Sequence, residues 1–325
     1  MKLIITGATG FIGRNLAQSL ARDGHEILAT GRALGVGNIL GEAGIEFRPA
    51  DIGRTGTLLE VFRPADCVIH CAGKSGDWGT YEDFHLANVI GTRNVLQGCV
   101  YHGIEKLIFI SSPSVYFNDQ DRLDLREDDP LPARQLSHYA ATKLISEKEV
   151  LTAREKGIDV INLRPKAVFG PYDTTFSPRI IRMSKKRRFP LINNGKAVVD
   201  ITYIDNFVDA VRLCLQAHEA AWNETYNISN GNPITIHDWF REMLAVFGED
   251  FRPRNVPFPM ARAIAGVAEL AGHFPFGPKT PAMTRYSVGY MAKSMTLNVE
   301  KAKKKLGYGP ELDTAGSFQR YKESL

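Results

Sequence analysis

The chain has 325 residues, which is enough for one large domain or two closely packed ones. Its formal net charge of +4 arises from 40 Lys and Arg against 36 Asp and Glu, too small and too dispersed for a nucleic-acid partner. The four cysteines show neither metal-ligand spacing nor disulfide density, and no apolar run reaches transmembrane length, so we expect no metal site and a cytoplasmic protein.

A predicted strand, Lys2–Ile5, opens the chain and runs into a glycine-rich turn and a helix that ends near Arg22. Glycines in such a turn let the backbone approach a pyrophosphate closely, and the helix N-terminus then faces the phosphates. The turn therefore predicts a dinucleotide site. Its residues are Gly7, Thr9, Gly10, Phe11, Ile12 and Gly13.

The second predicted strand, Glu26–Thr30, ends in Gly31 and Arg32. An acidic residue at this strand end would bind the ribose hydroxyls of NAD and repel a 2′-phosphate, and the sequence has none there. Arg32 instead supplies a cation suited to a phosphate, which favours NADP over NAD. A solvent-exposed loop arginine without a ligand is the alternative.

Three more predicted strands, Glu46–Ala50, Cys67–His70 and Lys106–Ile110, alternate with helices and predict an α/β fold with a parallel sheet. Ligands of such sheets bind beyond the carboxyl ends of the strands. There Asp51 can accept from an adenine amino group while Ile52 packs on the ring, or Asp51 can cap the next helix. Small residues that let a ligand lie over the fourth strand follow it: Cys71, Ala72 and Gly73.

Tyr139 and Lys143 stand four residues apart, so on a helix they project from one face, one turn apart. A free tyrosine has a pKa of about 10, and a nearby lysine cation lowers it by favouring the phenolate. The pair can pass a proton to or from an alcohol oxygen. Alone, the same spacing more often marks a solvated helix face.

These motifs occur in an order that resembles the extended short-chain dehydrogenases/reductases, a group that includes nucleotide-sugar epimerases and 3β-hydroxysteroid dehydrogenases. The resemblance covers nearly the whole chain, through Thr6–Gly13, His70–Gly73, Asn88, Ser111–Tyr116, Tyr139–Lys143, Leu163–Pro165, Val168–Pro171, Tyr203–Asn206, Tyr226–Ile228 and Leu306–Tyr308.

The resemblance implies a Rossmann-type doubly wound parallel sheet with a smaller, discontinuous C-terminal substrate lobe. Residues 1–165 would form the dinucleotide-binding domain, with 197–230 returning to it. Residues 166–196 and 231–325 would form the substrate lobe. The resemblance also implies a homodimer.

Roles follow from matching positions. Tyr139 matches the proton donor or acceptor, Lys143 its partner, and Ser112 the serine that hydrogen-bonds the reacting oxygen, with Ser114 as a candidate second donor. Phe117 is a departure, because the group has Gly after Val-Tyr, and it is expected to narrow or re-aim that loop. Three further cofactor contacts are implied, the first more structural than catalytic: Asn88, Pro165 and Val168.

Two stretches, Lys74–Gly79 and Pro281–Tyr286, resemble the 3β-hydroxysteroid dehydrogenase branch, which includes bacterial reductases of β-keto acids from long-chain lipids. The nucleotide-sugar branch often carries an arginine just before Tyr-Ile-Asp that helps hold a diphosphate. Here that place reads Val199–Ile201, without an arginine. The expected substrate contacts are Lys74, Trp78, Ser114 and Phe176.

Beyond Pro165 we predict helices over 176–186 and 236–247, and a segment over 252–276 that is rich in Pro, Phe and Ala. In its last part Met260, Ile264 and Val267 recur at helical spacing. One interpretation is a helix packed on its own domain. The other is an apolar lid over a lipophilic substrate, with peripheral membrane contact beside Arg252, Arg254 and Arg262.

The sequence therefore favours an NAD(P)-dependent oxidoreductase that acts on a secondary alcohol or ketone of a lipophilic substrate, 3β-hydroxysteroid-like or a β-hydroxy/β-keto acid. A nucleotide-sugar epimerase or dehydratase on the same scaffold is the first alternative. A non-catalytic NADPH-binding regulatory protein is the second.

Overall fold

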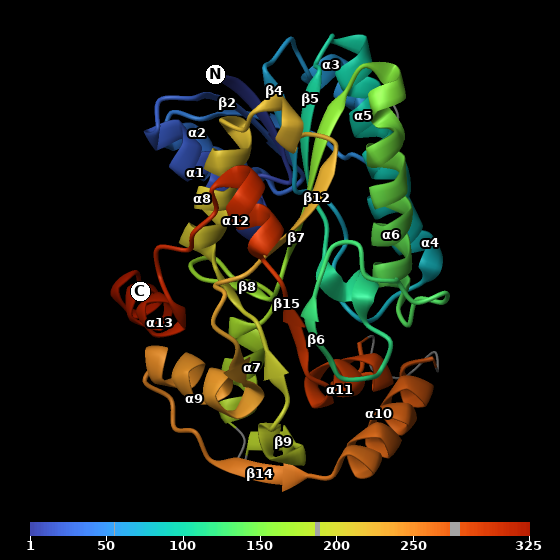
Figure 1. Ribbon diagram of the computed structural model, residues 1–325, viewed down its shortest axis with the longest axis vertical. Helices are drawn as coiled ribbons and strands as arrows, with labels where there is room; N and C mark the ends of the chain where they lie inside the picture. The colour runs from blue at the N-terminus through green and yellow to red at the C-terminus, as the bar shows by residue number, and fades with distance from the viewer. Residues whose placement is uncertain (55, 186–188, 274–279) are drawn as a thin grey trace.

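The computed structural model in Figure 1 describes residues 1–54, 56–185, 189–273 and 280–325. In this part of the chain one parallel sheet of seven strands forms the upper half. Its strands lie in the order β12 (Glu224–Ile228), β7 (Asp159–Pro165), β5 (Lys106–Ile110), β4 (Cys67–His70), β1 (Lys2–Thr6), β2 (Glu26–Gly31) and β3 (Glu46–Pro49). The strand order reverses between β1 and β4, as in a doubly wound fold.

Helices cover both faces of this sheet because each strand sends alternate side chains to opposite faces. Leu3 and Ile5 belong to a core cluster with α1, α2, α8 and α12, whereas Ile4 belongs to a second cluster with α3, α5 and α6. The predicted Rossmann-type α/β fold is confirmed. The helices are α1 (Phe11–Arg22), α2 (Leu34–Glu42), α3 (Thr57–Val61), α5 (Gly91–Tyr101), α6 (His138–Leu151), α8 (Ile204–Leu215) and α12 (Glu300–Leu306).

The lower half of Figure 1 consists of helices around short strands. Its helices are α7 (Ser177–Ser184), α9 (Ile236–Val246), α10 (Phe258–Gly272) and α11 (Arg285–Ala292), with α13 (Thr314–Glu323) at its upper left. Short strands pair as β13 (Ile234–Thr235), β10 (Val198–Val199), β15 (Met295–Leu297) and β6 (Arg122–Leu125), as β11 (Thr202–Tyr203) with β8 (Val168–Phe169), and as β14 (Pro253–Val256) with β9 (Phe189–Ile192). One further short helix, α4 (Tyr81–Phe84), lies beside α6.

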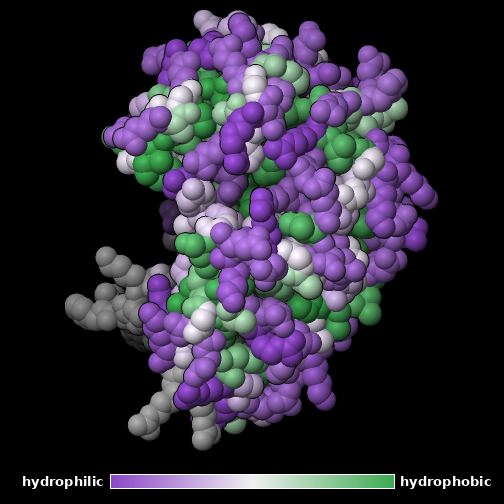
Figure 2. All heavy atoms as spheres, turned by 90° about the vertical axis from the view of Figure 1, so that its left-hand side faces the viewer, coloured by the Kyte–Doolittle hydropathy of each residue, from purple (hydrophilic) through white to green (hydrophobic). Residues whose placement is uncertain are grey.

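We keep the predicted division into a dinucleotide-binding domain and a substrate lobe as a proposal. In its favour, the chain returns to the central sheet at β12, which pairs along its length with β7. The first strand of the returning segment, β10, pairs instead with β13 and β15 of the lower half. Figure 2 shows the left-hand side of the molecule, which is mostly hydrophilic and whose outline is indented between the two halves.

Neither interpretation of the segment over 252–276 describes where the large apolar residues of α10 lie. Met260, Ile264, Val267 and Leu270 are 55%, 52%, 69% and 64% exposed, and none of them lines the central cavity described below. The opposite face carries the small residues Ala261 and Ala265, which pack against α11 at Val288. Small side chains let the two helices approach closely, and this leaves the large ones pointing outward.

The lid expectation is therefore wrong for these side chains, and a packed helix describes only the alanine face. Residues 274–276 of the predicted segment lie outside the described residues. None of the described helices is both long enough and apolar enough to cross a membrane.

Candidate active site

The glycine turn between β1 and α1 leaves no room for side chains. Gly7 has a φ of +71°, and a Cβ atom on it would lie 2.7 Å from the Ala72 backbone. A Cβ on Gly13 would lie 2.3 Å from the Gly7 carbonyl oxygen. Gly10 occupies the N-cap of α1, so no side chain covers the N–H groups of the first turn. This backbone cradle fits a dinucleotide pyrophosphate.

The N-terminus of α6 carries the two residues of the proposed proton transfer. The Ser137 hydroxyl caps the helix by accepting from the Ala140 N–H at 3.1 Å, which starts the helix at His138. Tyr139 and Lys143 then line one cavity with Ser112, which follows β5. The Ser112 side chain hydrogen-bonds Tyr139.

Lys143 is buried and directed at the end of β5. Its Nζ donates to the Ile110 carbonyl oxygen at 2.6 Å and lies 4.2 Å from the centre of the Phe109 ring. Burial lowers the pKa of Lys143 to about 8, against the opposing charge of Glu147. The lysine therefore lies closer to neutrality at physiological pH than an exposed one.

The pKa of Tyr139 differs from the sequence prediction, in which Lys143 lowers it. Burial raises the pKa of Tyr139, the hydrogen bond with Ser112 lowers it, and the charge of Glu147 raises it further. In the chain without a cofactor the effect of burial on the pKa of Tyr139 is the largest, because a phenolate is costly away from water. The phenol is thus protonated at neutral pH, which suits it to give a proton to a ketone oxygen.

The central cavity has a volume of about 580 Å³ and brings together most of the predicted residues. These are Gly7, Gly10, Phe11, Ile12, Gly13, Cys71, Gly73, Lys74, Asn88, Ser112, Ser114, Tyr139, Lys143, Pro165, Val168 and Phe176. The Ser114 hydroxyl is buried and has no hydrogen-bond partner among the described residues, so it is available to a ligand. Burial raises the pKa of the Cys71 thiol to about 12, so that side chain is a small neutral lining group.

Asn88 joins three segments around this cavity. Its Oδ1 accepts from the Lys74 N–H at 2.7 Å, and its Nδ2 donates to the Lys74 carbonyl at 3.1 Å and to the Thr142 hydroxyl at 2.9 Å. These bonds hold the loop after β4 against α6. They support the structural interpretation of this residue.

Six predicted residues do not line the cavity: Thr9, Arg32, Asp51, Ile52, Ala72 and Trp78. Among them Arg32 is exposed at the end of β2, and Asp51 Oδ1 accepts from the Gly53 N–H at 3.0 Å. Ile52 is a core residue whose side chain packs on Gly91, and Trp78 meets His273 edge to face at 4.9 Å.

Sequence reasoning missed the apolar wall of the substrate half. The wall combines residues of α7, β9 and the α11 region that are far apart in the sequence: Ile180, Met183, Leu191, Ile192, Met283, Tyr286, Val288, Tyr290 and Met291. The helical spacing of Ile180 and Met183 was the available signal. Phe117 supports the wall from behind, with ring centres 5.5 Å from Tyr286 and 5.2 Å from Tyr290.

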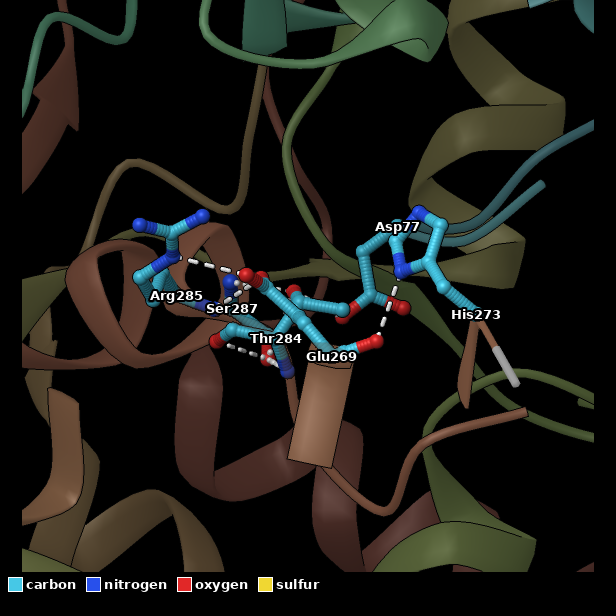
Figure 3. A network of polar contacts seen from close by, with 6 residues as sticks. All are labelled: Asp77, Glu269, His273, Thr284, Arg285 and Ser287. Atoms are coloured by element: carbon cyan, nitrogen blue, oxygen red, sulfur yellow. Dashed lines mark hydrogen bonds and ion pairs between the residues drawn. The ribbon is translucent and has the colours of Figure 1, made fainter. Parts of the chain in front are cut away.

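A polar network fixes the start of α11 and so the position of this wall (Figure 3). The Thr284 hydroxyl caps α11 and donates to Asp77 of the loop after β4 at 2.8 Å. Glu269 of α10 accepts from the backbone and side chain of Arg285, both at 2.7 Å. The network thereby ties α10, α11 and the loop after β4 together.

The fold and this cavity define an enzyme that uses a nicotinamide dinucleotide. The chain belongs to the NAD dependent epimerase/dehydratase family, whose sequence profile matches residues 3–229. It is an extended short-chain dehydrogenase/reductase, as expected from the sequence.

Three known proteins to which the chain is similar follow. The chain is 31% identical to the 2-alkyl-3-oxoalkanoate reductase of Stenotrophomonas maltophilia (strain K279a), over 100% of this chain and 99% of the relative. It is 27% identical to a mouse (Mus musculus) decarboxylating sterol-4-alpha-carboxylate 3-dehydrogenase, over 100% and 91%. A solved UDP-glucuronic acid 4-epimerase from Bacillus cereus in complex with NAD has a TM-score of 0.77 and 22% identity, over 99% and 96%, and shows the shared fold.

Proposed function

We propose that the protein transfers a hydride between a nicotinamide cofactor and a secondary alcohol or ketone of a lipophilic substrate, of the 3β-hydroxysteroid or β-hydroxy/β-keto acid type. The observation that carries this proposal is one cavity shared by Ser112, Tyr139 and Lys143 with an extended apolar wall. The relatives named as an oxoalkanoate reductase and a sterol dehydrogenase support the same substrate classes.

When bound, the nicotinamide supplies the hydride acceptor or donor. In the oxidative direction Tyr139, as the phenolate, would take the proton of the substrate hydroxyl. In reduction Tyr139 returns the proton to the ketone oxygen. Ser112 would hold that oxygen by a hydrogen bond, and Lys143, which lines the same cavity, would bind the ribose of the cofactor.

A nucleotide-sugar epimerase is the competing proposal, and the shared fold with the B. cereus epimerase supports it. Val199 in place of an arginine and the apolar wall favour the oxidoreductase. Turnover of 3-hydroxy acids, 3β-hydroxysteroids and UDP-sugars, followed by nicotinamide absorbance and sugar analysis, separates the two. Sugar epimerisation without oxidation of either alcohol class would reject our proposal.

We propose NADP as the preferred cofactor, on the strength of the exposed Arg32 at the end of β2. Replacement of Arg32 by Gln should raise the Kd for NADPH about tenfold and leave that for NADH nearly unchanged, because only the 2′-phosphate loses a charged partner. An added carboxylate at Gly31 is a poorer test, since a Cβ there would lie 2.4 Å from the Thr9 hydroxyl. Fluorescence titration with both cofactors measures the effect, and a wild type that prefers NADH would contradict the assignment.

We also propose peripheral membrane contact through 252–276, carried by the outward apolar face of α10. Arg252 pairs with Asp250 at 2.5 Å and Arg262 with Asp119 at 2.6 Å, whereas Arg254 forms no ion pair with another described residue. With one such arginine, burial of apolar side chains rather than charge would supply most of the binding. The proposed homodimer and cytoplasmic location rest on the sequence analysis alone.

The α10 face gives a direct prediction. Combined replacement of Ile264 and Val267 by Ser should lower vesicle binding at least about tenfold and leave the KM for short and long substrates unchanged, because these side chains do not line the cavity. Replacement of Val100 by Ser, an exposed residue of α5, is the matched control. Wild-type vesicle sedimentation by the double variant would refute the contact, and a KM that rises with substrate length would restore the lid.

A further inference from the structure

A buried lysine lies behind the apolar wall, and no ion pair joins it to any other described residue. Lys166 follows β7 directly and is 1% exposed. Its Nζ donates to the Tyr290 hydroxyl at 2.9 Å and lies 4.3 Å from the centre of that ring. Among the described residues no carboxylate lies within 4.0 Å of this Nζ. A buried ammonium is costly unless an anion is near, so this one calls for an explanation.

The acidic group whose charge acts on Lys166 accepts a hydrogen bond from the backbone. Asp200 is also 1% exposed, and its Oδ2 accepts from the Leu297 N–H at 2.6 Å. Its charge acts on Lys166 only from beyond ion-pair distance, and burial lowers the pKa of Lys166 to about 7 despite it. An anion bound nearby would stabilise the charged lysine.

Tyr290 connects this lysine to the cavity. It lines the cavity together with Ser112 and Tyr139, and its ring packs against both Phe117 and Tyr286. Since its oxygen accepts from Lys166, its own O–H proton is left for another acceptor, and a phenol polarised in this way is a strong donor. The hydroxyl of Ser114, buried and without a partner among the described residues, lines the same cavity.

We propose that Tyr290, positioned and polarised by Lys166, binds a carboxylate of the substrate, so that the protein acts on β-hydroxy or β-keto acids in preference to neutral alcohols. One buried ammonium and one phenol hydroxyl are suited to bind a group with a single negative charge, such as a carboxylate. A diphosphate would require more cations. The other cations that line the cavity among the described residues have partners: Lys143 donates to the Ile110 carbonyl at 2.6 Å, Lys74 pairs with Asp83 at 2.9 Å, and Arg179 donates to the Ala282 carbonyl at 2.9 Å. This inference rests on the proposed oxidoreductase function and specifies its substrate.

The test compares a long-chain 3-hydroxy acid with its methyl ester, both assayed for oxidation with NADP⁺. The wild type should prefer the acid. Lys166→Met and Tyr290→Phe should each lower kcat/KM for the acid by about tenfold to a hundredfold, mainly through KM, and change that for the ester by no more than about twofold. Tyr226→Phe, which removes a buried phenol hydroxyl that donates to the Ala221 carbonyl at 2.7 Å and does not line the cavity, should keep the preference.

Three results would overturn the subsite. The first is a wild type without preference for the acid. The second is an equal loss for acid and ester in both variants, which a merely structural role would give. The third is a preference that disappears in Arg179→Gln and survives in Lys166→Met. If the wild type oxidises neither compound, the proposed function fails, and calorimetric titration of the cofactor-loaded protein then decides the subsite: equal affinity for acid and ester rejects it.

Discussion

Replacement of Tyr139 by Phe should lower kcat by about a hundredfold to ten-thousandfold and leave the Kd for the nicotinamide cofactor within about threefold of the wild type. Phenylalanine keeps the ring and loses only the hydroxyl that hydrogen-bonds Ser112. The proton then has no donor or acceptor at the reacting oxygen. The glycine turn that holds the cofactor is untouched, which is why binding should survive.

The measurement pairs steady-state turnover with a cofactor titration on the same preparation. Replacement of Tyr101 by Phe removes a phenol hydroxyl from the exposed end of α5 and should change neither quantity. Turnover by the Tyr139 variant at the wild-type rate would remove this residue from the mechanism. A loss of turnover that tracks a loss of cofactor binding would assign it to binding instead.

The parts of this site that lie within short stretches were open to prediction from the sequence. The turn from Gly7 to Gly13 is a strand, a glycine-rich bend and a helix start in succession, and each has a local signature. The pair at Tyr139 and Lys143 depends only on the helical repeat. The alternation of strands and helices before this pair was enough to predict the parallel sheet.

The parts of the site that depend on contacts between distant residues could not be predicted from the sequence. The hydrogen bond from Lys166 to Tyr290 joins residues 124 positions apart, and no local sequence pattern at either residue predicts it. The pKa of Tyr139 follows its burial, which a spacing rule does not contain. On α10 the helical repeat was correct, but periodicity alone does not tell which face turns inward. The face with Ala261 and Ala265 turns inward, because it packs closely against α11.

The largest effect on stability is expected at the ion pair between Glu147 of α6 and Arg164 of β7. The two side chains are 2% and 6% exposed and form two hydrogen bonds, Nε to Oε1 at 2.9 Å and Nη2 to Oε2 at 2.6 Å. Arg164 also donates to the Tyr116 hydroxyl at 2.5 Å, and Tyr116 donates to Asn227 at 3.0 Å. The network thus joins α6, β7, β12 and the turn after β5.

Replacement of Glu147 by Ala should lower the free energy of unfolding by about 3–5 kcal/mol, because it leaves the Arg164 guanidinium buried without its carboxylate. Denaturant titration measures this loss. Glu149, two residues further along α6, pairs with the more exposed Arg93, and its replacement by Ala should cost at most about 1 kcal/mol. The double variant Glu147→Met with Arg164→Met removes both charges and should be more stable than Glu147→Ala. A Glu147→Ala protein no less stable than the Glu149→Ala protein would mean that water or a rearranged side chain compensates Arg164, and that the pair does not hold α6 against the sheet.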